Sequence, residues 1–148
     1  MNNPDLLKEL RDKFNETKKK LGFKSSFEEI NEIFFINDFI NYERFVNEFF
    51  SRQLCRRIME VYNSWLSYLH GLIMPNPGNS LMIMENRMLG EEDKKKISEI
   101  IKKILSLSSM NTLIIFNKNK KDEAKLIDDS VKFWKEYFQP EMKRLWKK

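Results

Sequence analysis

The chain has 148 residues, of which 41% are hydrophobic and 33% are charged, and its formal net charge is +5. This length and composition are typical of one globular domain over residues 1–148 and exclude a disordered chain. The single cysteine, Cys55, excludes an internal disulfide framework and any multi-cysteine zinc or iron–sulfur site.

The N-terminal residues predict two helices in succession. Asn3-Pro4-Asp5 has the order of a capping residue, a first-turn proline and a first-turn acid, and Gly22 follows a lysine run that is typical of a helix end. Ser26–Glu29 has the pattern of a capping box and predicts the start of a short second helix. This helix carries its apolar side chains at Phe27, Ile30, Ile33 and Phe34.

A long central helix is predicted over about residues 41–73. No glycine or proline falls between Ile40 and His70, and apolar residues recur there at helical spacing. A helix of about 30 residues would be roughly 45 Å long. We expect it to be the spine of the fold.

The uncharged corner that follows is predicted to be a rigid turn. Residues 76–79 place proline and glycine where a type II turn needs them. Ser80 is then the predicted cap of a short helix ending near Gly90. The uncharged stretch Val61–Met84 contains polar residues and two prolines, so we expect no membrane span.

Two further helices are predicted in the last third of the chain. The acids of Glu91–Asp93 begin the first, in which Thr112–Phe116 has strand-like composition but would lack a partner strand, so we predict helix. The second begins at Asp122 and is predicted to end at Gln139-Pro140, with a final turn beyond it. The whole pattern predicts an all-α bundle of six or seven helices around one long central helix.

The inventory of reactive side chains is poor. Cys55 and His70 are the only thiol and the only imidazole, and 15 helical residues would hold them about 22 Å apart. We expect Cys55 to be buried and inert. No metal-ligand motif and no glycine-rich phosphate loop is present in the sequence. We therefore predict a protein that is not an enzyme and that has no cofactor, no metal and a cytoplasmic location.

One binding hypothesis is contact with a protein partner or with a second copy of the chain, a homo-oligomer. Adjacent aromatic residues such as Phe49 and Phe50 point about 100° apart in a helix, so burying both needs packing on two sides. Methionine-rich surfaces adapt to partner shape. The predicted partner-binding residues are Phe49, Phe50, Met82, Met84 and Met88.

The alternative hypothesis is nucleic-acid binding by the basic C-terminal region. Acidic and basic residues are equal in number over residues 1–90, so the whole positive excess lies in residues 91–148. Basic and aromatic side chains together can hold phosphates and stack on bases. The predicted residues are Lys143, Arg144, Trp146, Lys147 and Lys148. A third possibility is an apolar small ligand bound between helices.

Overall fold

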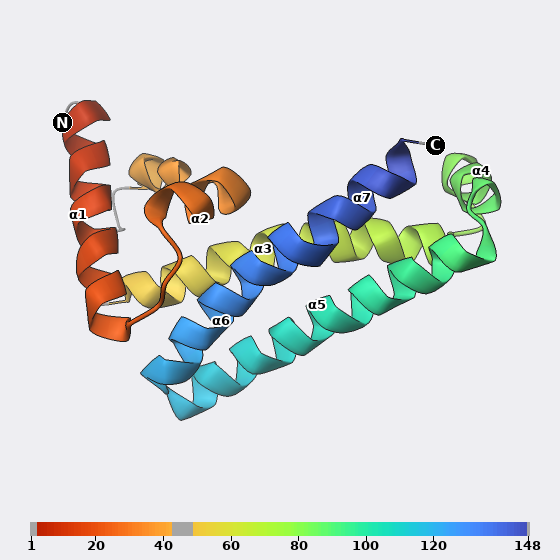
Figure 1. Ribbon diagram of the computed structural model, residues 1–148. Coiled ribbons are helices and arrows are strands. Elements are labelled where there is room, and N and C mark those ends of the chain that lie inside the picture. Colours follow the sequence, from red (N-terminus) through yellow and green to blue (C-terminus); the bar gives the residue numbers. More distant parts are fainter. Residues whose placement is uncertain (1–2, 43–48, 148) are drawn as a thin grey trace.

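A computed structural model describes residues 3–42 and 49–147, and this part of the chain is all-α (Figure 1). The helical segments before the corner are α1 (Asn3–Leu21), α2 (Phe27–Phe34), the 3-10 segment η1 (Ile36–Tyr42) and α3 (Phe50–Ile73). Those after it are α4 (Ser80–Met88), α5 (Glu91–Asn117), α6 (Lys120–Phe133), the π-helical segment η2 (Trp134–Phe138) and α7 (Gln139–Trp146). No strand occurs among these residues, so Thr112–Phe116 is helical, as predicted.

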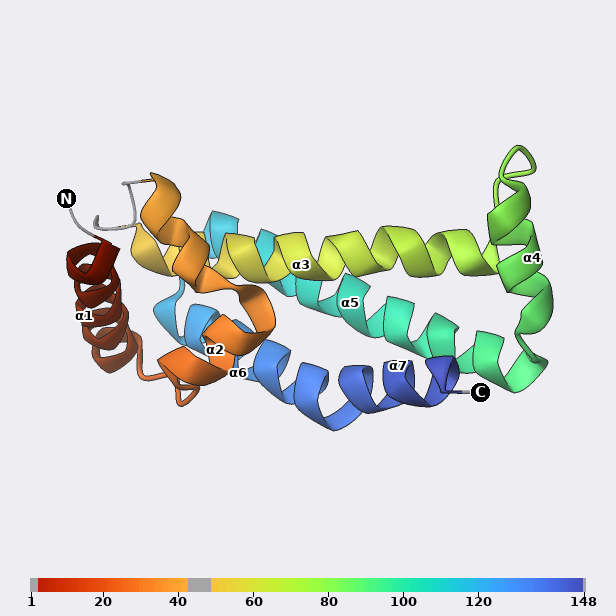
Figure 2. The ribbon, with the colours of Figure 1, turned by 90° about the horizontal axis from the view of Figure 1, so that it is seen from above.

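The long helix α3 is the central element. It packs against α5 and α6, and α4 contacts its C-terminal end. Figure 2 shows α1 at one end of the molecule and α4 standing across the other. The predicted arrangement around one long helix is therefore confirmed, although α3 begins later than predicted.

The start of the central helix is a correction to the sequence-based boundary. Residues 41–42 belong to η1, residues 43–48 lie outside the described residues, and α3 begins at Phe50. The chain changes direction before η1 because Phe35 adopts a left-handed conformation, with φ of 57°. The Asn37 N–H then donates to the side-chain oxygen of Asn31, at 2.8 Å, which closes the turn.

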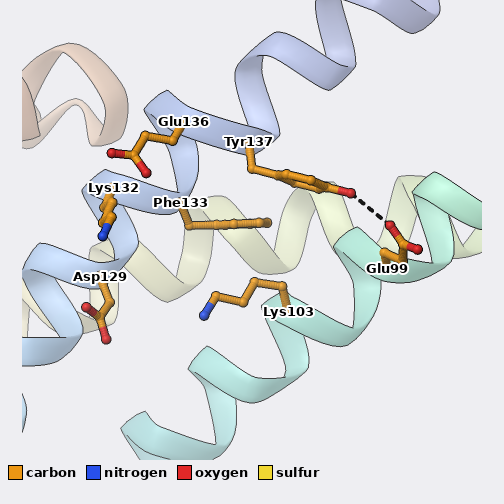
Figure 3. Close-up of a pocket in the computed structure, with 7 residues that line it drawn as sticks. All are labelled: Glu99, Lys103, Asp129, Lys132, Phe133, Glu136 and Tyr137. Atoms are coloured by element: carbon orange, nitrogen blue, oxygen red, sulfur yellow. Dashed lines mark hydrogen bonds between the residues drawn. The ribbon is translucent and has the colours of Figure 1, made fainter.

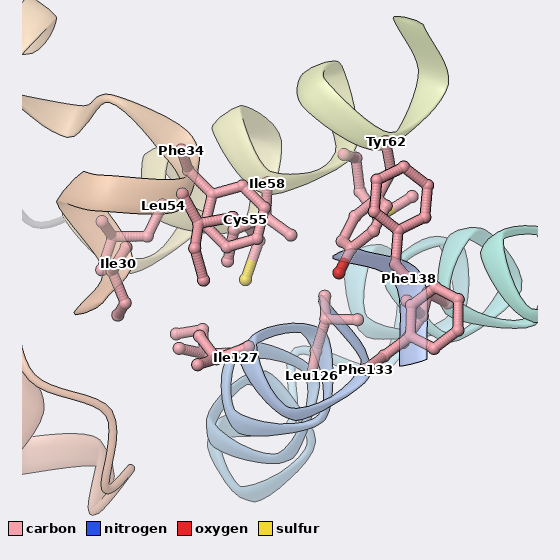
Figure 4. Packing of buried hydrophobic residues seen from close by; sticks show 14 of the residues in the cluster. Ile30, Phe34, Leu54, Cys55, Ile58, Tyr62, Leu126, Ile127, Phe133 and Phe138 are labelled. Atoms are coloured by element: carbon pink, nitrogen blue, oxygen red, sulfur yellow. The ribbon is translucent and has the colours of Figure 1, made fainter. Parts of the chain in front are cut away.

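Aromatic rings form the centre of the core around Tyr62 (Figure 4). The Tyr62 ring lies 5.7 Å from Phe34, 5.9 Å from Phe133 and 6.1 Å from Phe138, measured between centroids. Its hydroxyl donates to the backbone carbonyl of Ser130, so this buried phenol is satisfied. Three helices and the π segment are thus joined at one residue of α3.

Polar contacts fix the connection between α1 and α2 against α6. The Asp128 carboxylate accepts hydrogen bonds from the backbone N–H groups of Lys24 and Ser25, at 2.8 and 2.9 Å, and from the Ser25 hydroxyl at 2.7 Å. The predicted capping box of Ser26 and Glu29 is confirmed in both directions. Gly22 has the positive φ, 86°, that its predicted place after the helix requires.

Two helix starts are capped by asparagine where the sequence predicted other residues. Asn79, and not Ser80, caps α4, and α6 begins at Lys120 after Asn119 instead of at Asp122. Each asparagine side chain accepts a hydrogen bond from a backbone N–H of the first turn, at 3.1 Å for Asn79 and 2.9 Å for Asn119. Asparagine caps as well as serine or aspartate do, so composition alone does not decide between neighbours.

The helix that contains Pro140 continues through it, contrary to the predicted end at Gln139-Pro140. The segments α6, η2 and α7 follow one another without a break. Gln139 keeps helical angles, φ −63° and ψ −45°, and its N–H donates to the carbonyl of Trp134 five residues earlier. This wider π-helical turn accommodates a proline, which has no N–H and would clash with a carbonyl in a regular α-helix.

Candidate interaction surfaces

The outer face of α5 carries a row of apolar and small side chains over its last turns. Leu105, Ser109, Thr112, Leu113 and Phe116 recur at the spacing of one helical face, and we call them the α5 strip. The leucines at 105 and 113 are 49% and 60% exposed, and the phenylalanine is 78% exposed. In Figure 1, α5 runs along the lower edge of the molecule.

The strip lies in a stretch without any charged residue. Residues 104–117 contain no Asp, Glu, Lys or Arg. On the opposite face of the same helix, Ile104, Leu107 and Ile114 are buried, because α3 and α6 cover that side. Single exposed apolar residues are ordinary on protein surfaces. A row of them on an uncharged helical face is the pattern of a contact surface.

Lysines stand at both ends of the strip. Lys102 lies on the same face, three residues before Leu105, and is exposed. Lys118 follows α5 in a left-handed conformation, with φ of 52°, and Lys120 and Lys121 begin α6. None of these four lysines forms an ion pair within the part of the chain that the structure describes.

The methionines predicted to bind a partner lie on α4, a helix without a buried residue. Met84 and Met88 are exposed, at the end of the molecule where α4 crosses α3 and α5 (Figure 2). Met82 is half-buried, and its methyl group lies 2.5 Å from where a Cβ on Gly71 would stand. The α4 helix thus approaches α3 closely at Gly71, and Met82 packs inward there.

The two predicted phenylalanines have different environments. Phe49 is exposed, whereas Phe50 is only 1% exposed and packs edge-to-face on Phe39 in the core. Phe50 is therefore not available to a partner, and its assignment to a partner surface was wrong. The sequence identified the pair correctly as pointing in different directions, but it did not say which member faces the core.

The basic residues predicted at the C-terminus divide into two groups. Lys143 and Lys147 are exposed, and Lys148 lies outside the described residues. Arg144, in contrast, donates to Asp93 at 3.1 Å and to Glu141 at 3.0 Å. Asp93 is buried, so Arg144 balances the charge of a carboxylate that has lost its contact with water. The hydrogen bonds that Arg144 donates to Glu141 and Asp93 raise its own pKa.

An aromatic cavity lies beside Trp146. It measures about 340 Å³ and is lined by Ser64, Trp65, Tyr68 and Trp146. The Tyr68 ring centroid lies 6.2 Å from that of Trp65 and 6.4 Å from that of Trp146. Burial and a hydrogen bond to Glu85, at 2.7 Å, raise the pKa of Tyr68 to about 12, so its phenol stays protonated.

A second surface cavity of about 430 Å³ lies between α5 and the α6–η2 junction (Figure 3). Its lining residues are Glu99, Lys103, Asp129, Lys132, Phe133, Glu136 and Tyr137. The Tyr137 hydroxyl donates to Glu99 at 2.9 Å, and burial together with this bond raises the Tyr137 pKa to about 12. Five charged side chains of both signs make this cavity unlike the predicted apolar ligand site.

Reactive groups remain scattered. Cys55 is buried, and desolvation raises its thiol pKa to about 12, so the expected burial is confirmed. His70 is exposed in the last turn of α3. No group of three potential metal ligands forms among residues 3–42 and 49–147.

No protein-family model, curated protein or solved structure matches the chain. Within the described ranges, no helix is long and apolar enough to cross a membrane.

The strip residues Leu105, Leu113 and Phe116 were not among those predicted from the sequence. The uncharged run of residues 104–117 was the signal for them, because its apolar residues fall on both faces of a helix and one face must remain outside.

Proposed function

We propose that this chain is a helical interaction protein that binds another protein through the α5 strip. The observation that supports this proposal is the exposure of Leu113 and Phe116, at 60% and 78%, on an uncharged helical face. Large apolar side chains at the centre of a contact supply most of the binding energy in protein interfaces. A groove in a partner that covers this face would remove them from water.

The free energy available from burying the strip side chains fits a contact of weak to moderate affinity. Fully burying a leucine or phenylalanine side chain contributes about 1.5–3 kcal/mol. The three large side chains of the strip are already partly covered, so a partner would gain several kcal/mol from them. A micromolar dissociation constant needs about 8 kcal/mol after the entropic cost of association. Contacts outside the apolar strip must therefore contribute as well.

A paired-variant capture experiment tests the proposal. The double variant Leu113→Ser/Phe116→Ser removes the strip, and Leu81→Ser/Met88→Ser removes equally exposed apolar side chains on α4. We expect cross-linking in cells to capture a partner protein on the unaltered chain and on the α4 variant, but not on the strip variant. The unaltered chain and both variants should have the same melting temperature. Loss of the same protein only in the α4 variant would transfer the function to the methionines.

Self-association is the other form of this proposal, and light scattering of the purified chain tests it. A dimer that the strip variant abolishes would identify the second copy as the partner. A monomer at all concentrations would exclude self-association and leave binding to a different protein as the proposal.

A second candidate function, nucleic-acid binding, is favoured by the cavity at Trp146. Three aromatic side chains line this cavity, and the exposed Lys143 and Lys147 lie on the same terminal helical turns. Aromatic faces beside lysines can stack bases while the lysines hold phosphates. We expect any such binding of single-stranded DNA to weaken with salt and with Trp146→Ala or Lys143→Gln/Lys147→Gln. Absence of binding at low salt would exclude this function. Arg144 should be left intact in these variants because it pairs with the buried Asp93.

A further inference from the structure

The charges around the α5 strip define the partner more closely, and this step rests on the proposed function. The strip extends from Leu105 to Phe116, which is about 16 Å along a helix axis at 1.5 Å per residue. Lys102 stands at one end, and Lys118, Lys120 and Lys121 stand at the other. The surface is therefore an apolar segment of about three helical turns with positive charge at each end.

These charges are not paired with carboxylates of the described residues. The four lysines are exposed and lack ion pairs within the described residues. At the C-terminal end, three lysines precede Asp122 and Glu123 in the sequence, which leaves an excess of positive charge there. Both ends of the strip consequently favour an anionic group on whatever covers it.

A second copy of the chain fits this surface poorly. If two strips packed antiparallel, Lys102 of each copy would approach the Lys118 end of the other. If they packed parallel, each lysine end would meet the same lysine end of the other copy. Either arrangement brings like charges together, which costs free energy at an interface. The charge pattern thus favours a different protein over a homodimer through this face.

The shape of the strip favours a helix. Its middle consists of Ser109 and Thr112, which are small enough for another backbone to come close, and helix axes pack 8–10 Å apart. The Thr112 hydroxyl already donates to the Ser108 carbonyl at 3.1 Å, so covering it leaves no unsatisfied donor. Strand addition needs a sheet edge, and no strand exists in the described part of the chain.

A membrane surface is the other chemistry to weigh, because lysines and apolar side chains also bind anionic lipid. The Ser109 hydroxyl lies at the centre of the strip, beside Thr112, whose hydroxyl is already bonded to Ser108. Transfer of a hydroxyl into hydrocarbon without a partner is unfavourable, whereas a protein helix can offer polar groups there. The strip therefore suits a protein helix better than a lipid layer.

We propose that the α5 strip binds an amphipathic helix of another protein that carries acidic residues at both ends of a three-turn apolar face. The apolar side chains supply the contact, and the lysines at the two ends of the strip fix its length and position. This arrangement is helix-to-helix recognition with charge complementarity at the ends.

Two synthetic peptides of about 18 residues test the proposal, a length that gives five helical turns. They share leucines at i, i+3, i+4 and i+7 and differ only in having glutamates or lysines at both ends. Binding is measured by fluorescence anisotropy at low and high salt. We expect the glutamate peptide to bind at least about tenfold more tightly, with the difference shrinking as salt screens the charges.

Variants of the protein separate the apolar contribution to binding from the contribution of the charges. Leu113→Ser/Phe116→Ser should lose both peptides, whereas Lys102→Glu/Lys118→Glu should reverse the preference between them. All of these positions are exposed, so an unchanged melting temperature confirms that the variants are folded. Leu81→Ser/Met88→Ser on α4 is the matched control and should bind as the unaltered protein does.

The outcomes distinguish this inference from the proposed function. Equal affinity for the two peptides, lost in the strip variant, overturns the charge inference and leaves the strip as a protein-binding face. Failure of both peptides at about 1 mM overturns the inference, and a dimer that depends on the strip would then assign the face to a second copy. Tighter binding to vesicles of anionic lipid than to either peptide overturns both proposals. Reversed preference in the lysine variant supports the inference directly.

Discussion

The two faces of α5 have similar apolar side chains and opposite environments. Ile104 is 0% exposed, and its neighbour Leu105 is 49% exposed. Helices α3 and α6 cover the first face, and no other described helix makes an extensive contact with this part of the second. Apolar composition therefore indicates a tendency to be covered, whereas the surrounding helices decide which side the fold itself covers. The outer face stays exposed.

The largest expected effect concerns reactivity on the covered side. Burial raises the pKa of the Cys55 thiol from 9.0 to about 12, so at pH 8 its thiolate fraction is about a thousandfold lower than that of a free thiol. We expect Ellman's reagent to react with Cys55 only after denaturation. As pH rises from about 9 toward 12, the unfolded thiol ionises first, so this group lowers stability across that window. Fast labelling of the native protein would show that the core opens readily.

A neighbouring pair of substitutions compares the two faces of α5 directly. Ile104→Ala should lower the free energy of unfolding by about 2–5 kcal/mol, because it leaves a cavity against α3 and α6. Leu105→Ala should change the same free energy by less than about 1 kcal/mol, because half of this side chain is already in water. Urea unfolding of both variants gives the comparison. Similar losses would mean that the fold covers both faces.

A smaller effect is expected at the hydrogen bond that joins α3 to α6. Tyr62→Phe keeps the aromatic contacts with Phe34 and Phe138 but removes the hydroxyl that donates to Ser130. The loss should be about 1 kcal/mol, the usual net value for one such bond. Thermal unfolding monitored by circular dichroism measures it. A loss several times larger would show that the Tyr62 hydroxyl fixes more of the core than one ordinary hydrogen bond accounts for.

The smallest effect on stability is expected on the strip itself. Leu113→Ser/Phe116→Ser should change the free energy of unfolding by no more than about 1 kcal/mol, since surface substitutions usually have small effects. Urea midpoints and slopes test this expectation. A markedly lower midpoint would show that these side chains belong to the folded core.

Local signals in the sequence were sufficient for much of the fold. The capping box at Ser26, the positive φ of Gly22 and the acids at the start of α5 each depend on a few neighbouring residues, and all were confirmed. The missed boundaries depend on geometry that a local pattern does not contain. Pro140 continues a helix because a π-helical turn precedes it, and α3 begins after η1 instead of at residue 41.

The candidate surface was less predictable than the fold. Helical periodicity separates Leu113 from Ile114, but it does not tell which of them the fold will cover. The ion pair between Arg144 and Asp93 joins residues that lie 51 positions apart, so Arg144 was predicted as a nucleic-acid contact when it compensates a buried acid. The roles of such residues follow from packing between distant segments.

A nuclear magnetic resonance titration with the glutamate-ended peptide shows whether the α5 strip is the surface that the peptide contacts. Backbone amide shifts report which residues of the isotope-labelled protein contact the peptide. We expect the shifts to concentrate on residues 102–118, with little change on α4 or at the Trp146 cavity. Shifts centred on Met84 and Met88, or on Trp146, would contradict the assignment of the α5 strip as the binding surface.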